Sequence, residues 1–315
     1  MDDVLYIIVP YFNFLGINKL EENLNLFLTK NKFTNRARVV LSEGYIDNEL
    51  KDYSNLVYKH LKFKFKDIFW AKENLINLAI DNLPKDWKFV VWLDRDVVFS
   101  SEEWIEEAIK ELKISDIIQP WSLVMNPTSR TPPTPSSFPP LYPKMNQPKP
   151  ISNSIKQSFF SKMKEMPLNF WGHPGFAWGI NKNFYTKIKK IPDWFIVGAA
   201  DSVLASCCVY NLNNKRIAHK PPHATILMEL KFHDYAKFFK DVKFNSLNFE
   251  IFHVSHGTYE NRKYIERHTI LQKHNFDPNC DIFYNEQNII EFSEDWKMRA
   301  SKDIKNFFIS RQENL

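Results

Sequence analysis

The sequence has little glycine and no long apolar run. Only seven of its 315 residues are glycine. They form neither GxGxxG nor GxxxxGK[ST], which removes the main sequence signal of dinucleotide-binding Rossmann enzymes and of P-loop NTPases. No apolar run approaches the ~18 residues of a membrane span, and the start Met1-Asp2-Asp3 lacks the basic residues of a secretory signal. We therefore expect a soluble protein located in the cytoplasm.

The sequence also has few cysteines and only a small excess of positive charge. The three cysteines, Cys207, Cys208 and Cys280, have no metal-type spacing and cannot all pair, so we expect reduced thiols. The net charge of +5, from 42 basic and 37 acidic residues, favours anionic ligands only weakly and requires no nucleic-acid partner. With 44% hydrophobic residues the chain can bury a full core, in one large or two modest domains.

Short apolar runs alternate with helical periods in the first hundred residues. This alternation predicts an α/β sheet with helices on both faces, in which ligands bind beyond the carboxyl ends of the strands. We expect three such ends, at Pro10, Ser42 and Asp94. The expected strands are Leu5–Pro10, Arg38–Leu41, Leu56–Phe65, Phe89–Leu93 and, near the C-terminus, Phe249–Val254; the expected helices are Glu21–Lys30, Ala71–Leu83 and an apolar segment within Ile196–Val209.

Residues 120–150 hold ten of the eighteen prolines. Proline bars a regular helix or a central strand, so this segment is predicted to be a long irregular loop. Two interpretations remain open. The loop is either a surface excursion between structured parts or a lid that binds the acceptor of a reaction.

Two carboxylates one residue apart follow an apolar strand. Asp94 and Asp96 come directly after Val90-Val91-Trp92-Leu93. Such a pair can share a divalent ion bound to a diphosphate, and oxygen ligands suit Mg²⁺ or Mn²⁺. A solvated strand end is the alternative, but the position after a buried strand favours the metal site.

Two histidines and two arginines follow the last predicted strand. His253 and His256 are candidates for a further metal ligand, because two carboxylates supply too few donors. Side chains alternate along a strand, so positions i and i+3 face opposite ways unless the chain turns; we favour His253 as ligand and His256 near the phosphates. The guanidinium groups of Arg262 and Arg267 can hold diphosphate oxygens. An amphipathic surface helix is the alternative for the arginines.

Asp201 stands just before a predicted apolar helix, after Gly198-Ala199-Ala200. It is either the N-cap of that helix or a general base that deprotonates an acceptor hydroxyl. Several aromatic residues nearby in the sequence either stack on sugar faces or pack the core. These are Trp171, Phe176, Trp178 and Trp194.

Four ordered blocks of the sequence resemble the nucleotide-sugar half of GT-A glycosyltransferases, family-2-like, of a type found in viruses and bacteria. The resemblance spans residues 5–285, and its specificity lies in the order of the blocks. The blocks are Phe69-Trp70-Ala71-Lys72-Glu73-Asn74-Leu75-Ile76-Asn77 running through to Trp92-Leu93-Asp94-Arg95-Asp96-Val97-Val98-Phe99 and Trp104; Pro174-Gly175-Phe176-Ala177-Trp178; Gly198-Ala199-Ala200-Asp201; and His253-Val254-Ser255-His256-Gly257 followed by Asn261-Arg262, Tyr264 and Arg267.

The resemblance implies a GT-A catalytic domain over residues 1–285, with a Rossmann-like mixed sheet flanked by helices, and a helical C-terminal segment over 286–315. It implies Mn²⁺ or Mg²⁺, a nucleotide-sugar donor such as a UDP-sugar, and a hydroxyl on a glycan, lipid or protein acceptor. In an inverting transfer, Asp201 is the implied base. The implied donor-binding residues are Pro10, Tyr11, Glu43, Lys72, Asp94, Arg262 and Arg267; the metal ligands are Asp94, Asp96, His253 and His256; the acceptor-binding residues are Trp171, Phe176 and Trp178.

Two other functions remain open. A HAD-type phosphatase is one, because Leu93-Asp94-Arg95-Asp96-Val97-Val98 also fits its nucleophile strand. That motif normally lies near the start of its domain, whereas two strands and a helix precede it here. A non-catalytic carbohydrate-binding protein is the other, suggested by the aromatic content of 15%. For a viral member of the resembling family, the expected location is the host cytoplasm.

Overall fold

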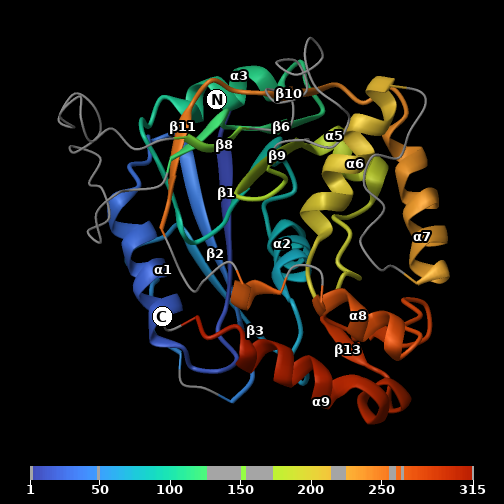
Figure 1. Ribbon diagram of the computed structural model, residues 1–315. Coiled ribbons are helices and arrows are strands. Elements are labelled where there is room, and N and C mark those ends of the chain that lie inside the picture. The colour runs from blue at the N-terminus through green and yellow to red at the C-terminus, as the bar shows by residue number, and fades with distance from the viewer. Residues whose placement is uncertain are drawn as a thin grey trace.

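The computed structural model describes residues 3–47, 50–125, 150–153, 173–213, 225–254, 260–263 and 266–313. Its main sheet has seven strands in the order β10-β6-β9-β4-β1-β2-β3, with helices on either side (Figure 1). The α/β fold with a mixed, helix-flanked sheet is therefore confirmed. The strands of this sheet are β1 (Leu5–Phe12), β2 (Ala37–Tyr45), β3 (Lys59–Lys64), β4 (Phe89–Leu93), β6 (Ile117–Gln119), β9 (Ala177–Asn181) and β10 (Phe244–Ser246).

Four neighbouring strands of the sheet are parallel. β1 pairs with β2 and β4, and β2 pairs with β3, all in the parallel sense. β9 is antiparallel to both β4 and β6, and β10 is parallel to β6. A parallel strand covered on both faces reads as a continuous apolar run, which explains why LYIIVPY of β1 is buried throughout. The carboxyl ends of β1 and β4 consequently lie at the same edge.

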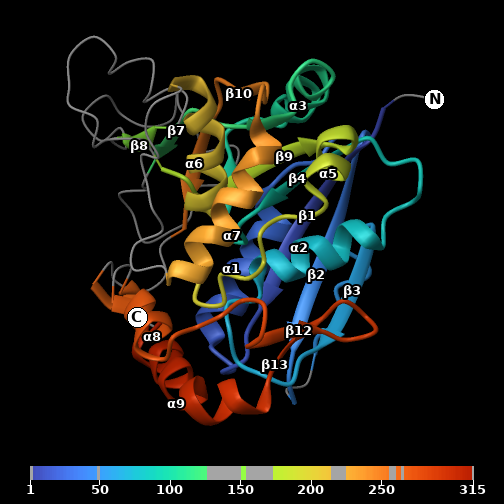
Figure 2. The same ribbon diagram turned by 90° about the vertical axis from the view of Figure 1, so that its right-hand side faces the viewer.

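Alternation along the strands divides the core into two layers. In β1, Tyr6 and Ile8 belong to one layer, while Leu5, Ile7 and Val9 belong to the other. The first layer packs against α2, α6, α7 and α9, and the second packs against α1 and α3. Figure 2 shows α2 lying across β1, β2 and β3 with α6 and α7 beside it. The helices are α1 (Asn18–Lys30), α2 (Lys72–Asp81), α3 (Trp104–Leu112), α5 (Lys182–Ile188), α6 (Ala200–Asn213), α7 (Ile226–Ala236), α8 (Glu266–Lys273) and α9 (Glu294–Ser310).

Two smaller sheets complete the described elements. One has four strands in the order β5-β11-β7-β8, and its β5 and β11 are antiparallel. The other is the antiparallel hairpin β12–β13, which packs with α9 into the layer that contains α2. The predicted division after residue 285 falls inside this hairpin. The bounds are β5 (Val97–Phe99), β7 (Leu123–Met125), β8 (Pro150–Asn153), β11 (Glu250–His253), β12 (Ile282–Tyr284) and β13 (Ile290–Phe292).

The last long helix, α9, is held by its apolar stripe. Its buried residues Trp296, Ala300, Ile304 and Phe308 recur every four positions, which places them on one face of a helix. The Ser293 hydroxyl caps its start by accepting a hydrogen bond from the Trp296 backbone N–H at 3.2 Å. α9 runs along the bottom of both ribbon views. Because α9 is packed in this way, it fixes the position of the residues that follow it, including Arg311 and Glu313.

Several predicted boundaries shift. β2 continues to Tyr45 instead of ending at Leu41, because Ser42, Glu43 and Gly44 keep pairing with β1 and β3. β1 likewise continues two residues past Pro10, to Phe12. β3 starts only at Lys59, and its exposed positions carry lysines, as is usual at a sheet edge.

Most of the proline-rich loop lies outside the described residues, since the structure describes nothing between Met125 and Pro150. Trp171, His256 and Tyr264 also lie outside them. Among the helices that the structure does describe, none combines the length and the hydropathy required to cross a bilayer.

Candidate active site

A pocket of about 540 Å³ opens at the carboxyl ends of β1 and β4. This is the edge at which open α/β sheets bind their ligands. Segments far apart in the sequence meet there, from the end of β1 to the residues that follow α9. The lining residues that matter most below are Pro10, Trp70, Lys72, Asp94, Arg95, Asp96, His173, Gly175, Phe176, Asp201, His253, Arg262, Arg267, Phe308, Arg311 and Glu313.

A lysine that lies between two aspartates lines the pocket. The Lys72 Nζ lies 2.7 Å from Asp94 Oδ1 and 3.1 Å from Asp201 Oδ2. The lysine side chain is 7% exposed, whereas the two carboxylates are 25% and 23% exposed. α2 begins at Lys72 and α6 begins at Ala200, so two helix starts bring this group together. We call Asp94, Lys72 and Asp201 the carboxylate–lysine group.

Burial and charge act in opposite directions within this group. Burial alone would lower the pKa of Lys72, but the charges of Asp201 and Asp94 outweigh it and raise that pKa above its ordinary value. Lys72 therefore stays protonated. Burial raises the pKa of Asp201, against the lowering effect of Lys72. Asp201 is consequently a stronger base than an ordinary aspartate.

Asp201 does not cap α6. It is the second residue of that helix, after Gly198 and Ala199, which both have φ near +91°. Such a conformation is strained for alanine and turns the chain sharply into the helix. A carboxylate in the first turn is favoured by the helix dipole. The N-cap interpretation is therefore wrong, and the turn directs Asp201 to Lys72.

The loop before β9 holds Asp94 from the other side. The Phe176 backbone N–H donates to Asp94 Oδ2 at 3.2 Å, and the Asp94 N–H donates to the Phe176 carbonyl at 2.8 Å. Phe176 has a positive φ of 78°, an unusual value for an aromatic residue. Both oxygens of Asp94 thus have protein partners, one in Lys72 and one in this loop.

Asp96 and His253 form the best candidate pair for a divalent ion. Asp96 Oδ1 lies 3.8 Å from His253 Nε2. A single ion with ligand bonds of about 2.1 Å can span that separation. The antiparallel pairing of β5 with β11 sets His253 opposite Val97, and the Val254 N–H donates to the Asp96 carbonyl at 2.7 Å. The sheet register therefore creates the pair.

The donor set fits a nucleotide-bound ion better than a structural metal centre. The described part of the chain contains no cluster of three or more potential histidine, cysteine, aspartate or glutamate ligands. Mg²⁺ needs no such cage, since it is usually held by one or two carboxylates together with water and substrate phosphates. Asp96 fits that pattern as the carboxylate, and His253 would add one nitrogen ligand.

His173 lies among the cationic groups of the pocket but stays neutral. Burial lowers its pKa to about 3, with further lowering by the charges of His253 and Arg262. Its Nδ1 accepts a hydrogen bond from the Gly175 N–H at 3.0 Å, and its ring stacks on Phe176 at 4.1 Å between centroids. A Cβ on Gly175 would lie 3.0 Å from the His173 ring, so any larger residue there would have to displace that ring.

Three predicted site residues do not line the pocket. Tyr11 is 4% exposed, and Glu43 binds His60 Nε2 at 2.7 Å in a nearly inaccessible pair. Trp178 is 1% exposed: its indole N–H donates to the Pro174 carbonyl at 2.6 Å, and its ring stacks on Phe244. In β1, alternation turns Tyr11 away from the pocket that Pro10 and Phe12 line, whereas the pocket lining includes no residue of β2 or β9.

Other residues of the pocket were not predicted as site residues. Arg95 stands between the two predicted ligands, and Trp70 and His173 stand within or beside the matched blocks, so a scan of each block for polar and aromatic residues would have found them. Arg311 and Glu313 carry no local signal. They reach the pocket only because α9 folds back along the molecule.

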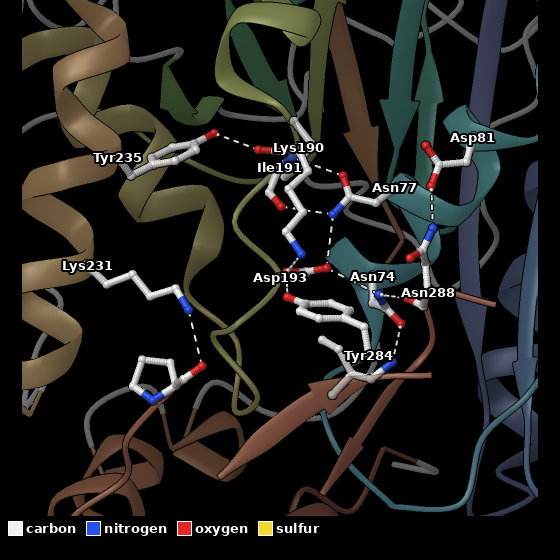
Figure 3. Close-up of polar contacts among 12 residues, drawn as sticks. Asn74, Asn77, Asp81, Lys190, Ile191, Asp193, Lys231, Tyr235, Tyr284 and Asn288 are labelled. Carbon is white, nitrogen blue, oxygen red and sulfur yellow. Dashed lines mark hydrogen bonds and ion pairs between the residues drawn. The ribbon is translucent and has the colours of Figure 1, made fainter. Parts of the chain in front are cut away.

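A second carboxylate network ties the segment before α6 to α2 (Figure 3). Asp193 Oδ2 accepts hydrogen bonds from the Asn74 and Asn77 side-chain amides, each at 3.2 Å. Asp193 Oδ1 accepts from the Tyr284 hydroxyl at 2.6 Å and pairs with Lys190 at 3.3 Å. Asn74 and Asn77 follow Lys72 on the same helix. The network therefore fixes the chain that leads to Asp201 relative to the helix that carries Lys72.

No family model matches this chain, and no curated protein matches it. Solved structures do. Residues 1–349 of TarS from S. aureus match with a TM-score of 0.37 and 16% identity, over 64% of this chain and 54% of that one. A mannosyltransferase from Pyrobaculum calidifontis, in complex with GDP-Man and Mn²⁺, matches with a TM-score of 0.37 and 15% identity, over 66% and 52%.

The catalytic domain of Drosophila beta1,4galactosyltransferase 7, in complex with xylobiose, matches with a TM-score of 0.39 and 10% identity, over 95% of this chain and 98% of that one. This chain thus spans about half the length of the TarS and mannosyltransferase chains that it matches. The function proposed next rests on the residues of the pocket.

Proposed function

We propose that this protein is a metal-dependent glycosyltransferase that moves a sugar from a nucleotide-diphosphate sugar, such as a UDP-sugar, to a hydroxyl group of an acceptor. The observation that supports this most strongly is the convergence of Asp94, Asp96, Asp201 and His253 with arginines on one pocket at the carboxyl edge of the sheet. Carboxylates can bind a metal ion or accept a proton, and guanidinium groups can bind a diphosphate.

The donor is assigned to the metal side of the pocket. Asp96 and His253 would hold the divalent ion, which when bound supplies positive charge that stabilises the leaving diphosphate. Arg262 lines the same pocket as Asp96 and His253 and would add a guanidinium for the diphosphate. Asp94, predicted as a further metal ligand, has Lys72 and the Phe176 N–H on its oxygens, which favours a role in orienting the donor.

The acceptor is assigned to the Asp201 side. In an inverting transfer, the acceptor oxygen bonds to the anomeric carbon as the bond from that carbon to the diphosphate breaks. The bonding pair leaves with the diphosphate, and the acceptor proton passes to an Asp201 carboxylate oxygen. Lys72 keeps Asp201 ionised before the step, and burial of Asp201 strengthens it as a base. Phe176 offers an aromatic wall to the acceptor.

The two alternatives have weaker support. A phosphatase of the HAD type needs Asp94 as a free nucleophile, whereas both of its oxygens have protein partners. A carbohydrate-binding protein needs aromatic faces at its surface, whereas Trp92, Trp104, Trp121, Trp178 and Trp296 are fully buried.

A thermal-shift series tests the proposal. The protein is heated with each of a panel of nucleotide sugars, with Mn²⁺, with Mg²⁺ and without a metal ion. A transferase is expected to gain stability from one donor and only when the metal ion is present. The best donor is then assayed for slow hydrolysis to free sugar and nucleotide diphosphate. Turnover of p-nitrophenyl phosphate with no response to any nucleotide sugar would instead support the phosphatase.

A further inference from the structure

The C-terminal end of the described chain forms part of the pocket. Phe308 from α9, and Arg311 and Glu313 just after it, line the same cavity as Asp201. Arg311 is only 3% exposed, so it is a buried arginine and not a solvent-exposed side chain at the mouth of the pocket. The apolar stripe of α9 packs into the core and fixes where this arginine lies.

Arg311 and a second buried arginine, Arg267, both contact the indole ring of Trp70. The Arg311 guanidinium carbon lies 5.0 Å from the Trp70 ring centroid, and that of Arg267 lies 5.8 Å from it. Trp70 itself is fixed, because its backbone N–H donates to the Ile196 carbonyl at 2.8 Å and its ring meets Phe12 edge-on. A fixed aromatic ring therefore contacts two guanidinium groups that line the same pocket.

The bonding capacity of Arg311 is only partly used. Its Nη2 donates to Glu313 Oε1 at 2.5 Å. Its Nε, in contrast, is buried and has no hydrogen-bond partner in the part of the chain that the structure describes. A buried donor without a partner is costly, and a guanidinium carries several donors in one plane that suit phosphate oxygens. This side chain is thus able to bind an anion in the pocket.

Arg267 and Trp70 lie on the Asp201 side of the pocket. A Cβ built on Gly198 would approach Arg267 Nη1 to 3.0 Å and Trp70 to 3.2 Å, so the turn that leads into α6 packs directly on both side chains. The positive charge of Arg267 also acts on Asp201. Five cationic and four acidic side chains line the pocket, and that balance favours an anionic ligand even before a metal ion binds.

We propose that Arg311 and Arg267, held on Trp70, form a second anion-binding subsite that takes a phosphate-type group of a substrate. This inference deepens the proposed function, because the donor and the acceptor named below are those of the proposed transferase. The bound group is either the diphosphate of the donor or a phosphate carried by the acceptor. Both have the same oxygen chemistry, and the experiment below distinguishes them.

The experiment compares wild type with Arg311→Gln and Arg311→Lys by titration calorimetry. The probes are pyrophosphate and inorganic phosphate without metal ions, and uridine and UDP with Mn²⁺. Arg311→Gln is expected to weaken binding of the anions roughly 10- to 100-fold, as loss of a hydrogen-bonded charge does. Arg311→Lys keeps the charge but loses the planar fork, so its loss is expected to be smaller. Lys305→Gln is the control, an exposed cation on the same helix outside the pocket.

The pattern of losses identifies the source of the group. Weaker UDP binding with unchanged uridine binding assigns the subsite to the donor diphosphate. Unchanged UDP binding with weaker phosphate binding assigns it to the acceptor. Wild-type affinity of Arg311→Gln for all anionic probes overturns the subsite, and thermal unfolding confirms that each variant is folded. If wild type binds pyrophosphate through Arg311 yet responds to no nucleotide sugar, the transferase proposal fails while the subsite stands.

Discussion

Two aspartates face the same helix and differ in what surrounds them. Asp201 meets Lys72 at the start of α2, and its side chain is 23% exposed. Asp193 meets Asn74 and Asn77 further along α2, and its side chain is 1% exposed. One carboxylate opens onto a pocket, while the other is enclosed by amide, hydroxyl and ammonium donors.

The difference separates a reactive group from a structural one. A fully hydrogen-bonded buried carboxylate has nothing left to accept, so Asp193 stabilises the arrangement of three chain segments. Asp201 retains access to a ligand, and burial raises its pKa against the opposing charge of Lys72. Substituting each aspartate by asparagine should therefore give opposite results.

The metal pair should show the largest effect of all. Asp96→Ala removes the one carboxylate of the Asp96–His253 pair, and we expect it to abolish Mn²⁺-dependent binding of UDP while the protein stays folded. Calorimetry with UDP and Mn²⁺ measures the binding, and thermal unfolding checks the fold. Asp86→Ala, at an exposed acid outside the pocket, is the control. Wild-type affinity in Asp96→Ala would remove Asp96 from the metal site.

Asp201→Asn should separate rate from stability. We expect transfer to slow by ~10²–10⁴-fold, the usual effect of losing a general base, with donor affinity unchanged. The free energy of unfolding should change by about 1 kcal/mol, since the lost helix-dipole stabilisation is of that size, burial of the Asp201 charge offsets its pairing with Lys72, and Lys72 keeps Asp94 as a partner. A near wild-type rate would mean that the base lies elsewhere, or that the transfer retains configuration.

Asp193→Asn should do the reverse. Asparagine offers one oxygen and one amide, so either the two asparagines of α2 or the Tyr284 hydroxyl would face a donor instead of an acceptor. Leaving such buried donors unpaired should cost about 2–4 kcal/mol of unfolding free energy. Denaturant unfolding beside Asp201→Asn measures it. If both variants unfold like wild type, the Asp193 network does not hold the segment before α6.

Local pattern predicted the fold and the acidic part of the site. Apolar β-branched runs and helical periods predicted β1 to β4, β11, α1, α2 and α6, because burial dictates residue type along each of them. Asp94, Asp96 and Asp201 could be singled out because each lies at the end or the start of such an element. The structure brings Asp94, which follows β4, and Asp201, in the first turn of α6, onto Lys72.

Long-range packing explains what the sequence left out. Arg311 follows α9, more than two hundred residues after Trp70, and no local period links the two. Glu43 and Trp178 miss the pocket for a different reason: β2 and β9 lie beside β1 and β4, which end at the pocket, but no residue of β2 or β9 lines it. Sequence position places a residue on an element, whereas register decides which face it occupies.

The smallest expected effect tests one bond of the enclosed network. Tyr284→Phe removes the hydroxyl that donates to Asp193 Oδ1 at 2.6 Å and leaves the ring in place. Burial and the Asp193 charge raise the pKa of Tyr284, so its proton remains available to donate throughout the physiological range. One hydrogen bond to a charged group is lost while Lys190 still pairs with the carboxylate, so we expect a loss of about 1.5 kcal/mol. Tyr58→Phe, at a tyrosine that is 54% exposed, is the control for removing a hydroxyl. Equal unfolding free energies for the two variants would show that Asp193 depends on its amide partners and not on β12.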